Sequence, residues 1–92
     1  MNESGYRVDE VVEVLARHSQ RATYGAVGGL VGLPARSVMS GKPKTQKNSW
    51  VVSKATGRPT GYLASETHPA LEQSLEVIST PEALAAWLRS HA

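Results

Sequence analysis

The sequence predicts a small α+β domain with three N-terminal helices, a β-hairpin and a C-terminal helix. Its 92 residues, 40% of them apolar, suit one domain built on one hydrophobic core. Apolar residues recur at helical spacing near both ends of the chain. Two short runs of β-type composition flank a turn that contains Gly57 and Pro59. These patterns predict helices at both ends and a hairpin between them, within a single domain over residues 1–92.

The first two helices follow from apolar spacing and from capping residues. Apolar residues from Val8 to Leu15 share one helical face, which predicts a helix from Arg7 to His18. Thr23 is a typical N-cap, and Gly32 is a typical C-terminal stop, so a short second helix is expected between them. Gly28 and Gly29 weaken that helix by about 1 kcal/mol each relative to alanine. Their presence indicates that another part of the chain approaches the backbone closely there.

A helix-turn-helix outline with a wing follows next. Pro34 predicts the start of a third helix, Pro34 to Ser40, which ends at Gly41. Residues Ser49 to Ser53 have strand composition, and Thr60 to Leu63 can return as a second strand. A β-hairpin that follows a helix-turn-helix is a wing, so the expected fold class is a small winged helix-turn-helix domain.

The C-terminal part of the chain completes the predicted fold. Leu75 to Ile78 are expected to form a short strand or extended piece. Thr80-Pro81-Glu82 combines an N-cap, a first-turn proline and a first-turn acid. Leu84, Trp87 and Leu88 would supply the core face of the last helix.

The charges are segregated along the chain. Eight of the ten basic residues fall in a stretch without Asp or Glu, and all eight acids lie outside it. The eight are Arg17, Arg21, Arg36, Lys42, Lys44, Lys47, Lys54 and Arg58. Such segregation gives one face a positive potential, which attracts polyanions in a salt-dependent way. The alternative is a solvated surface that merely lacks acids.

Several classes of site and function are disfavoured by composition. Without cysteine there is no disulfide framework, thiolate zinc site or cysteine nucleophile. His18, His68 and His91 lie in separate segments, and the Gly25 to Gly29 cluster lacks the lysine of a phosphate-binding loop. We therefore expect neither an enzyme nor a metal or cofactor site.

The predicted location is cytoplasmic, with no membrane partner. No apolar run approaches the roughly 20 residues that span a bilayer. The first residues, Met1 to Gly5, are polar and include an acid, unlike a secretory signal.

Three residues carry the most specific functional signal. Tyr24 opens the second helix, whose N-terminal amides favour a phosphate. Arg36 lies in the first turn of the predicted recognition helix, where side chains enter a DNA groove. Trp50 follows the basic loop and could stack on an exposed base. The structural alternatives are a half-buried core tyrosine, a generic phosphate contact and a core tryptophan.

These residues resemble a known family. Thr23-Tyr24-Gly25, the segment Gly32 to Val38, Trp50-Val51-Val52 and Gly57-Arg58 resemble the DNA-binding domain of alkylguanine-DNA alkyltransferases. They are closer to the non-catalytic relatives of these enzymes, the alkyltransferase-like proteins. The resemblance implies a tyrosine that contacts the DNA backbone and helps rotate a base outward. It also implies an arginine finger that fills the gap in the duplex.

By this resemblance Tyr24 and Arg36 take those two roles, and Trp50 matches a tryptophan of the pocket motif. An alternative alignment places Asn48 at the pocket position instead. Alkyl transfer is excluded, because the chain has no thiolate to accept the group. The expected partner is double-stranded DNA, with sensing of alkylated or flipped bases implied by the family.

The predicted DNA-binding residues are Thr23, Tyr24, Arg36, Ser37, Lys42, Lys44, Lys47, Lys54 and Arg58, and the predicted base-stacking or pocket residues are Asn48 and Trp50. A second hypothesis keeps the fold and makes the protein a sequence-specific transcriptional or phage-type regulator. A third is a protein-interaction adaptor that uses the acidic C-terminal third, Glu66 to Ala92.

Overall fold

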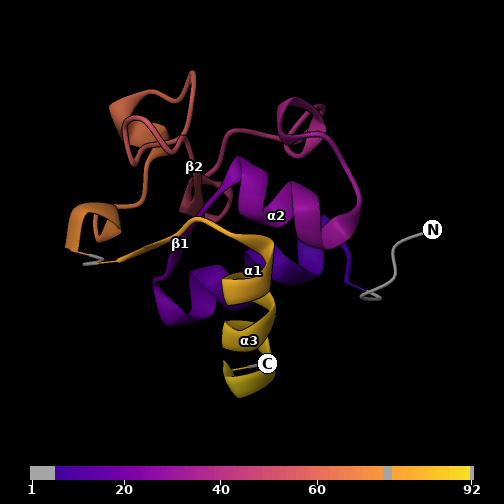
Figure 1. Cartoon of the computed structure of the whole chain (residues 1–92). Helices are drawn as coiled ribbons and strands as arrows, with labels where there is room; N and C mark the ends of the chain where they lie inside the picture. The colour runs from indigo at the N-terminus through magenta and orange to yellow at the C-terminus, as the bar shows by residue number, and fades with distance from the viewer. Residues whose placement is uncertain (1–5, 74–75, 92) are drawn as a thin grey trace.

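A computed structural model describes residues 6–73 and 76–91 of the chain (Figure 1). The polar start Met1 to Gly5, the first residue of the predicted Leu75 to Ile78 strand, and Ala92 lie outside the described residues. Within the described part the fold is α+β, with three α-helices and a three-stranded parallel sheet. In that part, no helix combines the length and the apolar character needed to cross a membrane.

Helix α1, Val8–His18, forms as the apolar spacing predicts, one residue later than expected. Its start is closed by Glu10, whose Oε1 accepts a hydrogen bond from the backbone N–H of Arg7 at 3.2 Å. Ser19 ends it in the left-handed conformation, with φ of 53°. The valines of its inner face and Leu15 are buried, so α1 contributes one wall of the core.

Strand β1, Arg21–Thr23, leads directly into helix α2, Tyr24–Val31. The predicted caps of α2 are confirmed. The Oγ1 of Thr23 accepts a hydrogen bond from the Ala26 N–H at 3.0 Å, and Gly32 ends the helix with φ of 82°.

The sheet is parallel, and the predicted β-hairpin wing is wrong. Strand β2 is Val51–Val52, strand β3 is Val77–Ile78, and both pair in parallel with β1 in the order β2-β1-β3. Val51 and Val52 are both fully buried. A strand buried on both faces is typical of parallel pairing, whereas a hairpin wing would present one face to water.

The segment predicted to return as the second hairpin strand, Thr60 to Leu63, is a loop instead. Gly61 turns the chain with φ of 77°. The loop then enters two short 3₁₀ helices, η3 (Ala64–Glu66) and η4 (Leu71–Gln73).

The predicted third helix, Pro34 to Ser40, is reduced to the 3₁₀ turn η1, Ala35–Ser37. The structure shows how tightly this turn lies on α2. A Cβ atom on Gly28 would meet the carbonyl oxygen of Leu33 at 2.5 Å and a methyl group of Val38 at 3.1 Å. The close approach expected at Gly28 is therefore confirmed. A second 3₁₀ helix, η2 (Lys47–Trp50), replaces the end of the predicted basic loop and the start of the predicted strand.

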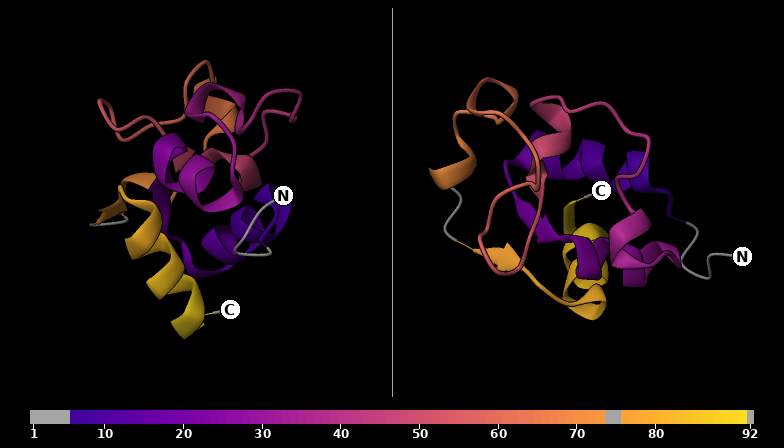
Figure 2. Two further views of the ribbon diagram at one scale, coloured as in Figure 1. Left: turned by 45° about the vertical axis from the view of Figure 1, so that its right-hand side comes forward. Right: turned by 90° about the horizontal axis from the view of Figure 1, so that it is seen from above.

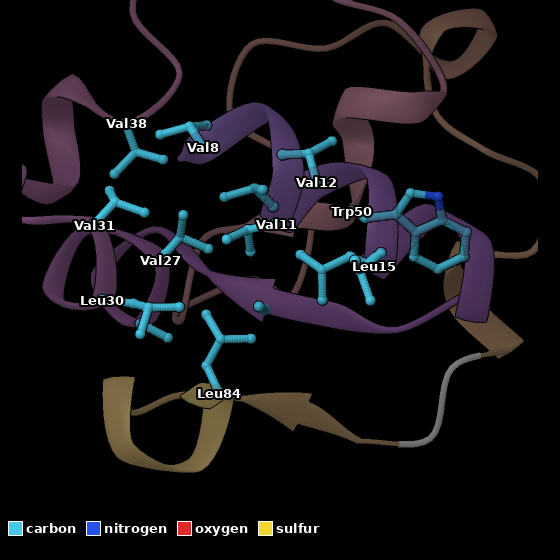
Figure 3. Packing of buried hydrophobic residues seen from close by; sticks show 14 of the residues in the cluster. Val8, Val11, Val12, Leu15, Val27, Leu30, Val31, Val38, Trp50 and Leu84 are labelled. Atoms are coloured by element: carbon cyan, nitrogen blue, oxygen red, sulfur yellow. The ribbon is translucent and has the colours of Figure 1, made fainter. Parts of the chain in front are cut away.

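Helix α3, Pro81–His91, closes the fold. Its predicted N-cap is confirmed, because the Oγ1 of Thr80 accepts a hydrogen bond from the Ala83 N–H at 3.2 Å. α3 packs against α2 at Gly29, where an added Cβ would overlap the ring of Pro81. The cluster in Figure 3 includes side chains of α1, α2 and α3, with Leu84 contributed by α3.

The helices and loops are divided between two sides of α2. η1 and the long loops between β2 and η3 lie on one side, and α3 with the C-terminal end of the chain lies on the other (Figures 1 and 2). The sheet and α2 thus separate a loop-covered face from a helix-covered face.

Candidate nucleic-acid interface

Tyr24 is held between α2 and a distant loop. It is half-buried, and its hydroxyl accepts a hydrogen bond from the Thr60 N–H at 2.9 Å. The neighbouring Thr23 is 3% exposed, and its hydroxyl is used as the α2 cap. The hydroxyl of Thr23, a predicted DNA contact, thus lies inside the fold and accepts the capping hydrogen bond of α2.

Tyr62 lies on the same side as Tyr24. Burial raises the pKa of Tyr62 above its ordinary value of 10.0, and the neighbouring phenol of Tyr24 and the carboxylate of Glu66 add to the rise. The hydrogen bond from Thr60 to Tyr24 thus brings the loop that carries Tyr62 to the start of α2.

Arg36 is presented on η1 and is exposed to solvent, while the adjacent Ser37 is half-buried. Arg17 pairs with Glu13 and Lys42 pairs with Asp9, whereas Arg36 forms no ion pair with a carboxylate of residues 6–73 and 76–91. Its planar guanidinium offers five N–H donors to a partner. The position of η1 on Gly28 aims this cation away from the core.

A pocket lies between η1, the start of α2 and the 60–63 loop. Its volume is about 460 Å³, and it is lined by Tyr24, Ala35, Arg36, Met39, Ser40 and Thr60. The lining combines an aromatic ring, two apolar side chains, two hydroxyl groups and one cation, and it contains no carboxylate. Such a mixture can hold a flat, partly polar molecule.

Arg17, Arg21 and Lys42 of the middle basic stretch each contact another group of the protein. Arg17 pairs with Glu13 at 3.4 Å. Arg21 donates from Nη1 to the carbonyl oxygen of Gly57 at 3.0 Å, which ties the 53–58 turn to β1. Lys42 pairs with Asp9 at 2.8 Å, so its predicted phosphate contact would require breaking this pair.

The other five basic side chains are exposed, and they belong to Arg36, Lys44, Lys47, Lys54 and Arg58. Lys44 lies next to the pocket side of the molecule, since its Cε would be 3.5 Å from a Cβ on Gly61. Lys47 contributes to lowering the pKa of Asp9 and therefore lies toward α1. The five cations are thus spread over η1, the segment 44–47 and the 53–58 turn.

Trp50 and Asn48, the predicted base-stacking and pocket residues, are buried and do not line this pocket. Trp50 is 0% exposed and packs against the ring of His68, with centroids 5.0 Å apart. Asn48 is buried, and its Nδ2 donates to the carbonyl oxygen of Pro43 at 2.8 Å. η2 packs on α1, which turns Trp50 inward as the largest side chain of the core.

Two histidines that lie far apart in the sequence come together beside α3. The rings of His18 and His91 are 5.0 Å apart, and Trp87 stacks on His91 at 4.5 Å. Nδ1 of His91 lies 2.8 Å from the carbonyl oxygen of Trp87, and Nε2 of His18 lies 3.2 Å from that of His91. The described residues contain no group of three or more side chains suited to a metal ion. This cluster therefore serves to join the end of α1 to α3.

The Asp9–Lys42 pair predicts a small pH dependence of stability. The hydrogen bond from Lys42 lowers the pKa of Asp9 below its ordinary 3.8, with further help from the charges of Lys42, Lys47 and Arg7. A lowered pKa in the folded state stabilises the protein above pH 3.8, and that contribution is lost as the pH falls through the pKa of Asp9. Asp9 is largely exposed, so solvent screening keeps the effect small.

We expect Asp9→Asn to lower the melting temperature slightly at pH 7 and to match the wild type as the pH approaches 2. Thermal unfolding of Asp9→Asn, Lys42→Ala and the double variant measures the coupling between the two side chains. A difference that stays constant across this pH range would contradict the ion-pair explanation.

Sequence reasoning missed Thr60 and Met39 as pocket residues, because no local pattern links them to Tyr24 or Arg36. The Thr60–Tyr24 hydrogen bond joins residues 36 positions apart, and only the folded chain brings them together. Comparisons with protein-family models, with curated proteins and with solved structures found no match.

Proposed function

We propose that this protein binds duplex DNA without catalysing a reaction. The face in question carries η1, the start of α2 and the loops 41–47 and 53–63. One observation supports this most directly: Tyr24 and the exposed, unneutralised Arg36 line the same carboxylate-free pocket. The two loops of that face also carry exposed cations, and polyanions are the partners that such charges attract.

In this proposal α2, the turn after it and η1 act as a helix-turn-helix, with η1 directed at a groove. The loop 53–62 takes the place of a wing. Lys44, Lys47, Lys54 and Arg58 contact phosphates, which fixes the position of the domain on the duplex but reads no sequence. Arg36 reaches further, because its planar guanidinium can hydrogen-bond base edges or enter the stack.

The pocket beside Arg36 receives an unstacked base. A volume of about 460 Å³ lies within the roughly 300–1,000 Å³ typical of small-molecule sites. Tyr24 can stack on a base, while Ala35 and Met39 offer apolar surface to an alkyl group on it. Arg36 then fills the space that the base leaves in the duplex. A damaged or mispaired base is favoured, because it costs less to unstack.

Replacing Arg36 by alanine is expected to weaken binding to a short duplex by roughly 1–3 kcal/mol. The slope of log K against log salt should fall by about one, because one phosphate-neutralising or base-contacting cation is lost. Fluorescence anisotropy over a salt series measures both quantities. Arg17→Ala is the matched control, since it removes the same charge from an exposed arginine that is paired with Glu13 away from the pocket. Equal effects of the two variants would overturn the assignment of η1.

A second experiment tests the pocket. The protein is titrated by NMR with the same duplex carrying guanine, alkylated guanine or an abasic site. We expect tighter binding to the altered duplexes whatever their flanking sequence, with the largest amide shifts at Tyr24, Arg36 and Thr60. Preference for one sequence over any lesion would make the protein a sequence-specific regulator. Absence of binding at about 0.15 M salt would overturn DNA binding altogether.

A further inference from the structure

Leu63 is an exposed apolar side chain on a fixed backbone. Its side chain is 67% exposed, which is the higher value of the two large hydrophobic residues that are exposed in the described part of the chain. Its N–H donates to Oε1 of Glu66 at 2.8 Å. Its carbonyl oxygen accepts from the Glu66 N–H at 2.9 Å and from Oγ1 of Thr67 at 3.0 Å. The loop therefore holds the residue firmly while leaving its side chain in water.

The surroundings of Leu63 place it on the loop-covered face. Thr60, three residues before it, lines the pocket and binds the hydroxyl of Tyr24. Tyr62, the residue before Leu63, is half-buried, so the loop turns one side chain toward the protein and the next toward water. Lys44 runs along the turn at Gly61. The exposed Leu63 side chain thus belongs to the same loop as Thr60, a residue that lines the pocket.

An exposed leucine does not contribute to phosphate binding, because phosphates are bound by cations and hydrogen-bond donors. The faces of bases and the sugar edges of a groove are the parts of DNA that an apolar side chain can cover. Proteins that kink DNA insert leucine or similar residues between base pairs, and they recover the cost of unstacking through the wider contact that results. Because the three backbone hydrogen bonds fix Leu63 in advance, little ordering of the loop opposes such insertion.

We propose that Leu63 is a wedge that enters the groove and separates the base step beside the pocket. This inference rests on the proposed DNA binding. It assigns distinct roles to two exposed residues: Arg36 in the pocket lining provides charge and hydrogen bonds, and Leu63, three residues after the lining residue Thr60, provides apolar contact that opens the stack.

The test uses the full chain and a short duplex that contains an abasic site and, at the adjacent step, 2-aminopurine. The abasic site sets the position at which the protein binds. Unstacking of 2-aminopurine raises its fluorescence. Leu63→Ala is expected to weaken binding on the order of tenfold and to abolish the fluorescence rise, with an unchanged salt slope. Leu63→Met keeps an apolar side chain and is expected to retain both. Lys44→Ala is the contrasting control, because it should lower the salt slope by about one and keep the fluorescence rise.

The binding and fluorescence results together separate a failure of the wedge from a failure of DNA binding. If the wild type binds the duplex but Leu63→Ala binds equally and raises the fluorescence equally, the wedge is wrong and DNA binding stands. A wild type that binds without any fluorescence rise also overturns the wedge. If the wild type does not bind, DNA binding and the wedge both fail. Thermal unfolding verifies that Leu63→Ala folds, which its exposure favours.

Discussion

Replacing Trp50 by alanine is expected to lower the free energy of unfolding by about 3–5 kcal/mol. Trp50 has no exposed surface and is the largest fully buried side chain of the described residues. Its removal would leave a cavity between η2, α1 and the ring of His68. Small domains have total stabilities of about 5–15 kcal/mol, so this variant should be partly unfolded at 37 °C. Urea unfolding followed by circular dichroism measures the loss.

Trp50→Phe separates the core role of Trp50 from a DNA contact. Phenylalanine keeps most of the apolar volume and removes the indole N–H, which is buried and has no hydrogen-bond partner among the described residues. We expect a loss below about 1.5 kcal/mol and unchanged affinity for DNA. A folded Trp50→Phe variant with strongly reduced DNA affinity would return Trp50 to the binding surface and contradict its burial.

Replacing Gly28 by alanine is expected to destabilise the protein by about 2 kcal/mol, even though alanine is the better helix former. The gain in helix propensity is about 1 kcal/mol. The clash costs more than this gain, because the added Cβ would lie 2.5 Å from the carbonyl oxygen of Leu33. The backbone must move to relieve such overlap. Because this turn carries η1, the displacement should also reduce DNA binding through Arg36.

Gly25→Ala is the matched control on the same helix. Gly25 is exposed, and the nearest atom to an added Cβ is Oγ1 of Thr23 at 4.0 Å. Without a clash, the substitution should stabilise α2 by about 0.5–1 kcal/mol. Thermal unfolding of both variants gives the comparison. If Gly25→Ala and Gly28→Ala shift the melting temperature in the same direction, close packing of η1 does not explain why position 28 requires glycine.

The helices could be predicted because their signals are local. The apolar face of α1, the Thr23 cap of α2 and the Thr80-Pro81 start of α3 each depend on residues within about one turn of one another. The sheet could not be predicted in the same way. Val51 pairs with Ala22 and Val77 with Arg21, so each strand depends on a partner far along the chain, and a run of two valines does not specify which partner.

The features of the candidate site also differ in whether they depend on neighbouring or on distant residues. The segregation of the basic residues, the place of Tyr24 as the first residue of a helix, and the need for glycine at a close contact can all be read from the order of the residues. The contacts of Arg21 and Lys42 within the protein, the burial of Trp50 in the core, and the pocket that Thr60 shares with Tyr24 and Arg36 appear only in the folded chain. The two groups of features differ in the range over which they act. Helix caps and side-chain periodicity act over a few residues, whereas burial and ion pairing depend on which distant segments the packed core brings into contact.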